Sequence, residues 1–103
     1  MSAHTLTRGT YVTVTITGMV CGMGRGQIRL ITPAGLEVVV VLEALTITGT
    51  VGMGQTVTAT LTGTVNGGGP RHTEVVYAAH GALYPVNVRT GDPAAVIAPA
   101  ATP

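Results

Sequence analysis

Residues 18–30, GMVCGMGRGQIRL, combine four glycines with an arginine, Arg25, in a short stretch. A glycine-rich loop binds phosphate when it leads into a helix N-terminus, whose unpaired N–H groups face the anion. The known fingerprints space their glycines as G-x-G-x-x-G or end in Gly-Lys-Ser/Thr. Here Gly22, Gly24 and Gly26 alternate, no lysine follows, and the strand-like QIRLIT comes next. The stretch therefore predicts a hairpin or barrel-corner loop, with an anion on Arg25 as the alternative.

Metal or acid–base chemistry is suggested by His72, Glu74 and His80, which share one face if they belong to one strand. At the rise of a β-strand, however, His72 and His80 lie about 26 Å apart. That separation is too large for both imidazoles to bind one ion. We expect ordinary surface histidines and no metal site.

The sequence also offers few residues for nucleophilic catalysis or for a two-carboxylate mechanism. Glu37 and Glu43 flank one valine-rich strand, which separates them too widely for a paired-carboxylate mechanism. Ser2 is the only serine and lies outside any strand-to-helix elbow, and Cys21 is the only cysteine. A single cysteine excludes an internal disulfide and a multi-cysteine metal site. We predict no catalytic site, no cofactor and no enzymatic activity.

The composition describes a small domain with a light core. The 103 residues include no Phe or Trp, so Val, Ile, Leu and Met must form the interior. The formal charge of +1 comes from five arginines, without lysine, against four acids, which argues against a polyelectrolyte partner. The longest apolar run, residues 38–42, is too short to cross a bilayer, and no signal-peptide pattern opens the chain. We expect no membrane contact and a cytoplasmic or virion-associated protein.

The elements expected to position these residues are strands. Apolar and polar residues alternate with period two in TYVTVTIT and TVTATLTGTV, and four consecutive valines favour a strand over a helix. TITGMVCGMG, TITGTVGMGQ and TLTGTVNGGG share one cadence, with Gly18, Gly49 and Gly63 inside strands. Such glycines mark bulges or barrel corners. We predict an all-β fold: a small closed or partly open β-barrel, of OB or SH3-like size, with about six short antiparallel strands.

The chain divides into three regions on this interpretation. Residues 1–8 form an N-terminal arm, residues 9–88 the β-barrel domain, and residues 89–103 an Ala/Pro-rich extended tail.

The valine strand also indicates a protein interface. Val39 and Val41 share a face with the flanking glutamates, and that face is wet in a one-layer barrel unless another segment covers it. The tail residues Val96, Ile97 and Pro99 are candidates for such a strap, on this molecule or on a neighbour. We therefore expect a protein partner or self-association into a homo-oligomer or a larger assembly.

Two main functional hypotheses follow, ahead of a third, in which the domain binds a protein partner as a monomer. The first is a non-enzymatic structural or assembly protein, such as a capsid decoration or head or tail assembly component of a virion. The alternative is a small nucleic-acid-binding barrel, in which Tyr11, Arg25 and Arg29 form a patch on one outer face. Only three tyrosines offer stacking surfaces, and the arginines are scattered, so this alternative rests largely on analogy with other small barrels.

Overall fold

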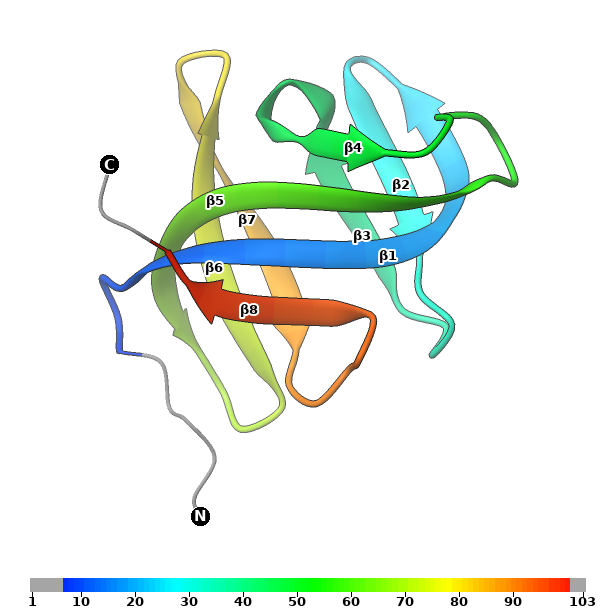
Figure 1. The fold of residues 1–103 in the computed structure, drawn as a ribbon. Helices are drawn as coiled ribbons and strands as arrows, with labels where there is room; N and C mark the ends of the chain where they lie inside the picture. Colours follow the sequence, from blue (N-terminus) through cyan, green and yellow to red (C-terminus); the bar gives the residue numbers. More distant parts are fainter. Residues whose placement is uncertain (1–6, 101–103) are drawn as a thin grey trace.

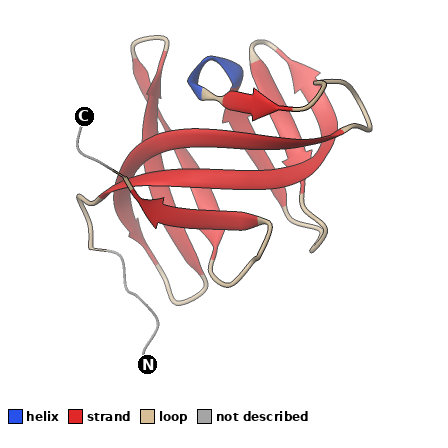
Figure 2. Ribbon diagram, in the orientation of Figure 1, coloured by secondary structure: helices blue, strands red, loops and turns tan. Residues whose placement is uncertain are grey.

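In the computed structural model, which describes residues 7–100, the chain is almost entirely β-structure (Figure 2). In β1 and β5, alternating side chains place the aliphatic residues on the buried face and the threonines on the other. The elements are β1 (Tyr11–Gly24), β2 (Gln27–Ile31), β3 (Glu37–Val41), the 3-10 turn η1 (Leu42–Ala44), β4 (Thr46–Thr48), β5 (Thr56–Gly68), β6 (His72–Ala79), β7 (Ala82–Arg89) and β8 (Ala95–Pro99).

The strands form one antiparallel sheet that curls strongly around its core. Its path is β3-β2-β1-β5-β6-β7, with β4 added to β5 and β8 added to β1. The two longest strands, β1 and β5, cross the molecule side by side (Figure 1). The ends of the path, β3 and β7, approach each other without pairing in the described residues, so the barrel stays partly open at this seam. The prediction of a small, partly open all-β barrel is confirmed.

The core is aliphatic, as the composition requires. Its largest fully buried side chains come from the inward positions of five strands, and they are Val12, Val14, Ile16, Val20, Ile28, Leu30, Val40, Val65 and Val75. Each contributes about 1.5–3 kcal/mol relative to an exposed position. The outward positions of β1 and β5 carry the threonine ladders, where Thr17 and Thr58 share a hydrogen bond of 3.1 Å.

The sheet consists of two similar halves. In the first half, β1 leads into the hairpin β2–β3 and then into β4. In the second half, β5 leads into the hairpin β6–β7 and then into β8. The last strand of each half pairs with the long strand of the other half: β4 with β5, and β8 with β1. The two halves are therefore exchanged by an approximate twofold rotation, with their final strands swapped across it.

The same relationship holds at single residues. The register of β1 against β2 shifts between Val20 and Gly22, and that of β5 against β6 shifts between Val65 and Gly67. Val65 follows Val20 by the same number of residues as Gly67 follows Gly22, as a repeated unit requires. A bulge bends a strand, so the matched bulges curl both halves alike.

Gly18 and Gly63 form a further matched pair in the two long strands. A Cβ on Gly18 comes within 2.8 Å of the Ile31 carbonyl oxygen, and one on Gly63 within 2.5 Å of that of Val76. Both glycines closely approach the backbone of a neighbouring strand, and the register shifts lie just beyond them in β1 and β5. Gly49 lies instead after β4, with a φ of +114°. Of the three similar segments in the sequence, only residues 15–24 and 60–69 are therefore structural counterparts.

The structure places the C-terminal region differently from the expected tail. Residues 95–99 form β8, which pairs with residues 12–16 of β1. The physical reason is a vacant edge, because β2 covers β1 only from Met19 onward. β8 fills that edge and does not reach β3, so it does not cover Val39. Most of the expected arm, residues 1–6, lies outside the described residues.

The glycine-rich stretch continues β1 into a tight hairpin. Gly24 pairs with Gln27, and the two residues between them, Arg25 and Gly26, have φ of +54° and +74°. Two positive φ angles are typical of a type I′ turn, whose twist matches that of paired strands. The prediction of a hairpin here is confirmed. No helix in residues 7–100 has the length and apolar character needed to cross a membrane.

Candidate functional site

A shallow groove of about 360 Å³ lies on the outer face of β1, β2 and β3. The registers of these three strands build it, because Gly22 pairs with Arg29 and Arg29 pairs with Val39. These three residues therefore form one row across the sheet, pointing outward. Ile28 and Leu30, which flank Arg29 along β2, point into the core.

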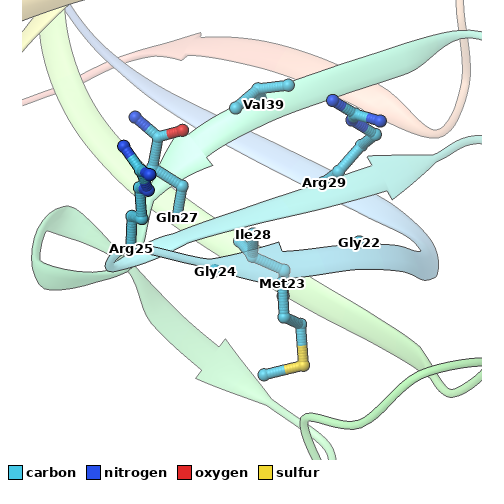
Figure 3. A pocket seen from close by; sticks show the side chains of 8 residues that line it. All are labelled: Gly22, Met23, Gly24, Arg25, Gln27, Ile28, Arg29 and Val39. Atoms are coloured by element: carbon cyan, nitrogen blue, oxygen red, sulfur yellow. The ribbon is translucent and has the colours of Figure 1, made fainter.

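The floor of the groove is open because glycines occupy it. Gly22 and Gly24 are both outward positions of β1 and carry no side chain (Figure 3). Above them stand Arg25, Gln27 and Arg29, while Met23, also among the lining residues, points to the other side of the strand. The glycines of the opening stretch thus hollow a surface as well as form a turn.

The groove can bind, but the residues that line it offer no groups for covalent chemistry. Its polar groups are two exposed guanidiniums and one amide, beside Val39, which is 43% exposed. Arg29 lies 3.8 Å from Glu37, with both side chains more than half exposed, so this pair contributes little to stability. The arrangement suits an anion or the side chains of another protein.

The predicted nucleic-acid patch is only partly assembled. Arg25 and Arg29 line the same groove. Tyr11 begins β1, whereas the groove adjoins the other end of that 14-residue strand. The expectation that Tyr11 shares their patch is therefore wrong. Period-two alternation puts residues on a common face but does not bring them together along a long strand.

The predicted protein interface is also divided. Val39 is on the outer face and exposed, but Val41 is only 4% exposed and belongs to the hydrophobic core cluster. The backbone N–H of Val41 donates to the Tyr77 hydroxyl at 3.0 Å. The assignment of Val41 to an exposed interface is therefore wrong, and its place is beside the seam.

The tail residues of that prediction lie on β8. Val96 points outward and is 50% exposed, Pro99 is exposed at the end of the strand, and Ile97 packs against the core. Ile97 is therefore partly engaged within its own chain, while Val96 is available to a neighbour.

Glu43 and Glu74 make structural contacts with neighbouring residues. Glu43 accepts a hydrogen bond of 2.6 Å from the His80 backbone and lies 3.1 Å from its Nδ1 atom. Glu74 accepts from the Asn66 amide at 2.7 Å. His72 and His80 stand at opposite ends of β6. No group of three metal-ligating side chains occurs in residues 7–100.

Comparison with known proteins found no relative of this chain. No family model matches the chain, and the searches of curated proteins and of solved structures returned no match. Function must therefore be inferred from the surfaces described above.

A second groove, at the seam, involves residues that the sequence did not single out. It has a volume of about 340 Å³ and lies between the start of β3 and the end of β7. Thr32, Arg89 and Asp92 line it. Thr32 and Asp92 are the two buried polar side chains of the described core. The sequence signal was weak, since each belongs to an ordinary turn motif, TPAG or TGDP.

Proposed function

We propose that this chain is a non-enzymatic assembly protein that joins further copies of itself through two separate outer surfaces. The observation that carries the proposal is the outward exposure of two β-branched apolar side chains within paired strands, Val39 on β3 and Val96 on β8. Both occupy positions where the sheet alternation favours polar residues, and an exposed apolar contact gains free energy when another chain covers it.

The two surfaces are well separated on the sheet. Val96 pairs with Thr15 of β1, whereas Val39 lies two strands away from Gly22 of the same strand. Thr15 and Gly22 are themselves about 23 Å apart along β1 at ordinary strand rise. Two distinct surfaces favour head-to-tail contacts, in which the Val96 surface of one copy meets the Val39 groove of the next. Such contacts generate rings or larger arrays.

The groove beside Val39 supplies the shape for this contact. Its glycine floor leaves room for a neighbouring side chain, and its arginine rim supplies hydrogen-bond donors around an apolar centre. An apolar centre with a polar rim is the usual anatomy of a protein interface. A role as a virion component, such as a capsid decoration or head or tail assembly protein, is the specific form of this proposal that the low charge and compact β-architecture suggest.

The test is sedimentation velocity of Val39→Lys and Val96→Lys at micromolar to millimolar concentration. We expect the natural chain to associate and each variant to remain monomeric alone. Mixing the two variants should restore a dimer, because one copy retains the Val96 surface and the other retains the Val39 groove. Leu83→Lys is the matched control and should associate normally, because Leu83 is 71% exposed and lies on β7, next to the β6–β7 hairpin. A natural chain that stays monomeric throughout would contradict the proposal.

Nucleic-acid binding is a second candidate, favoured by the placement of Arg25 and Arg29 on one groove. Two arginines are a small electrostatic footprint, so we expect weak, strongly salt-dependent binding to a single-stranded oligonucleotide. Fluorescence anisotropy should detect it in the natural chain and lose it in Arg25→Ala/Arg29→Ala. Tyr11→Ala should bind as the natural chain does, because Tyr11 lies at the other end of β1. Unchanged binding in the double variant would reject this candidate.

A further inference from the structure

Because the two halves are related by an approximate twofold rotation, the residues around the seam groove can be compared with their counterparts in the other half. The missing Cβ of Gly18 faces the Ile31 carbonyl, and that of Gly63 faces the Val76 carbonyl. Ile31 and Val76 are therefore counterparts, and so are the residues that follow them, Thr32 and Tyr77. Both are buried, but one is a short hydroxyl side chain and the other a phenol ring.

The Tyr77 ring fills the barrel at its own end. It packs beside Tyr84, its cross-strand partner, with ring centroids 6.0 Å apart. Its hydroxyl oxygen accepts the Val41 N–H at 3.0 Å, and thus bridges from β6 to the end of β3. That side chain closes the seam at one end of the molecule.

At the other end the equivalent space is open. Thr32 stands in place of Tyr77, and its hairpin partner Leu36, whose carbonyl oxygen accepts the Thr32 N–H, stands in place of Tyr84. The groove of about 340 Å³ lies directly against both residues and reaches Arg89 at the end of β7. The cavity therefore lies where the phenol ring of the counterpart would be.

A backbone donor is available at the far side of this space. Arg89 follows Val88 as Val41 follows Val40, so it holds the position of the donor that binds Tyr77. The Thr90 N–H donates to the Arg71 carbonyl across the β6–β7 ladder. Because backbone groups alternate in direction along an antiparallel strand, the N–H of Arg89 points away from β6.

A buried acceptor without a partner lines the same groove. Asp92 is 9% exposed, and its Oδ1 atom accepts the Ala94 N–H at 2.9 Å. Its Oδ2 atom is buried without a hydrogen-bond partner among residues 7–100. A buried carboxylate oxygen in this state is costly unless a donor reaches it. Arg71 and Arg89 balance Glu37 and Asp92 around the groove, which favours an uncharged ligand over an ion.

We propose that the groove between Thr32, Arg89 and Asp92 binds a small uncharged phenol. The ring takes the place that the Tyr77 ring has at the opposite end. The phenol hydroxyl accepts the Arg89 N–H and donates to Asp92 Oδ2, so both unused backbone and side-chain groups are satisfied. This inference is independent of the proposed assembly function, since Val39 and Val96 do not line the groove.

The probe is p-cresol, which reproduces the side chain of tyrosine. Titration into ¹⁵N-labelled protein should shift the amide resonances of Thr32, Arg89 and Asp92, with a dissociation constant on the order of 1 mM for a ligand of this size. Toluene, which lacks the hydroxyl, should bind at least fivefold more weakly. Shifts confined to other regions, or equal binding of toluene, would overturn the proposal.

Thr32→Tyr supplies the phenol from the chain itself. We expect this variant to lose the p-cresol shifts and to melt about 5 °C higher, because the new ring repeats the Tyr77 contact. Thr62→Tyr, on the exposed face of β5, is the matched control and should bind p-cresol unchanged. If Thr32→Tyr does not fold, Asp92→Asn still decides. It retains the Oδ1 acceptor for Ala94 but turns the Oδ2 acceptor into a donor, and should weaken p-cresol at least fivefold. Unchanged affinity in Asp92→Asn would contradict the assigned hydrogen bond.

Discussion

Thr32 and Tyr77 occupy the same position in the two halves of the sheet, but only Tyr77 crosses the seam to bond the opposite strand. The Tyr77 hydroxyl thereby links β6 directly to the end of β3, although the sheet path does not join these strands. One side-chain contact closes one end of the barrel, and its absence leaves the other end open. The two ends of the barrel differ in shape because one half has Thr32 where the other half has Tyr77.

Tyr77→Phe should destabilise the chain. The ring keeps its packing, but the Val41 N–H loses its acceptor in a buried site, at a cost of about 1–3 kcal/mol. Urea denaturation followed by circular dichroism measures this difference. Tyr84→Phe is the matched control, because no hydrogen bond of its hydroxyl is found in the described residues, and it should fall within about 0.5 kcal/mol of the natural chain. Equal effects of the two variants would show that the bond to Val41 carries no weight.

The same contact predicts a pH dependence. Burial is the larger influence and raises the pKa of Tyr77 above its usual 10.0, although the hydrogen bond from Val41 opposes it. The unfolded chain therefore ionises this phenol at a lower pH than the folded chain does. The stabilisation is complete below pH 10 and is lost as pH rises through the folded pKa. Urea midpoints between pH 8 and 11 should decline more steeply for the natural chain than for Tyr77→Phe. Tyr84→Phe should retain most of the decline, because the Tyr84 charge also raises the Tyr77 pKa but is the smallest of the three influences on it.

Much of the fold follows from sequence patterns alone. Period-two alternation located β1 and β5, because each of these strands buries one face and exposes the other, and the run of four β-branched valines located β3. Glycine context also drew attention to Gly18 and Gly63, each of which closely approaches a backbone carbonyl of a neighbouring strand. Turn chemistry identified the hairpins, since residues such as His80 and Gly81 tolerate positive φ. These are local properties, which a single sequence records well.

The parts that sequence analysis missed depend on contacts between distant segments. β8 forms a strand because β1 leaves an edge free for it. The Ala/Pro-rich sequence of β8 shows no period-two alternation that would have predicted a strand. Val41 was expected outside from the alternation of β3, but it is buried in the core cluster beside the seam, where its N–H bonds the Tyr77 hydroxyl, and that contact comes from a distant segment. The seam groove is lined by both Thr32 and Asp92, which are far apart in the sequence and belong to different halves of the sheet. No local motif predicts that they lie together.

Deleting residues 90–103 should destabilise the whole domain, not merely remove an appendage. β8 donates and accepts backbone bonds along β1, and its Ala95 is 7% exposed in the core beside Ile16. Losing this strand exposes the edge of β1 and should cost about 3 kcal/mol or more. Thermal unfolding followed by circular dichroism measures the loss. Val96→Lys, which changes only an outward side chain of β8, should melt within a few degrees of the natural chain. A truncated chain with an unchanged melting temperature would mean that β8 is a detachable tail.

Alanine at Gly18 and Gly63 tests the repeated bend that curls both halves. A methyl group on Gly63 would come within 2.5 Å of the Val76 carbonyl oxygen and 2.8 Å of a Val75 methyl carbon, and one on Gly18 within 2.8 Å of the Ile31 carbonyl oxygen. Backbone atoms cannot yield as a flexible side chain does, so each substitution should cost about 1–3 kcal/mol, with Gly63→Ala the larger effect.

Gly24→Ala is the matched control for this pair. Gly24 belongs to the same strand as Gly18, has an ordinary φ, and has open space where its Cβ would be. It should leave the urea midpoint nearly unchanged, while Gly18→Ala and Gly63→Ala lower it in parallel. Because the two bends lie in matched positions, both variants should also loosen the seam, which ¹⁵N–¹H spectra report through the Val41 and Arg89 amides. If Gly24→Ala is as damaging as Gly63→Ala, the loss reflects strand glycines in general, and the tight approach at the bend is not its cause.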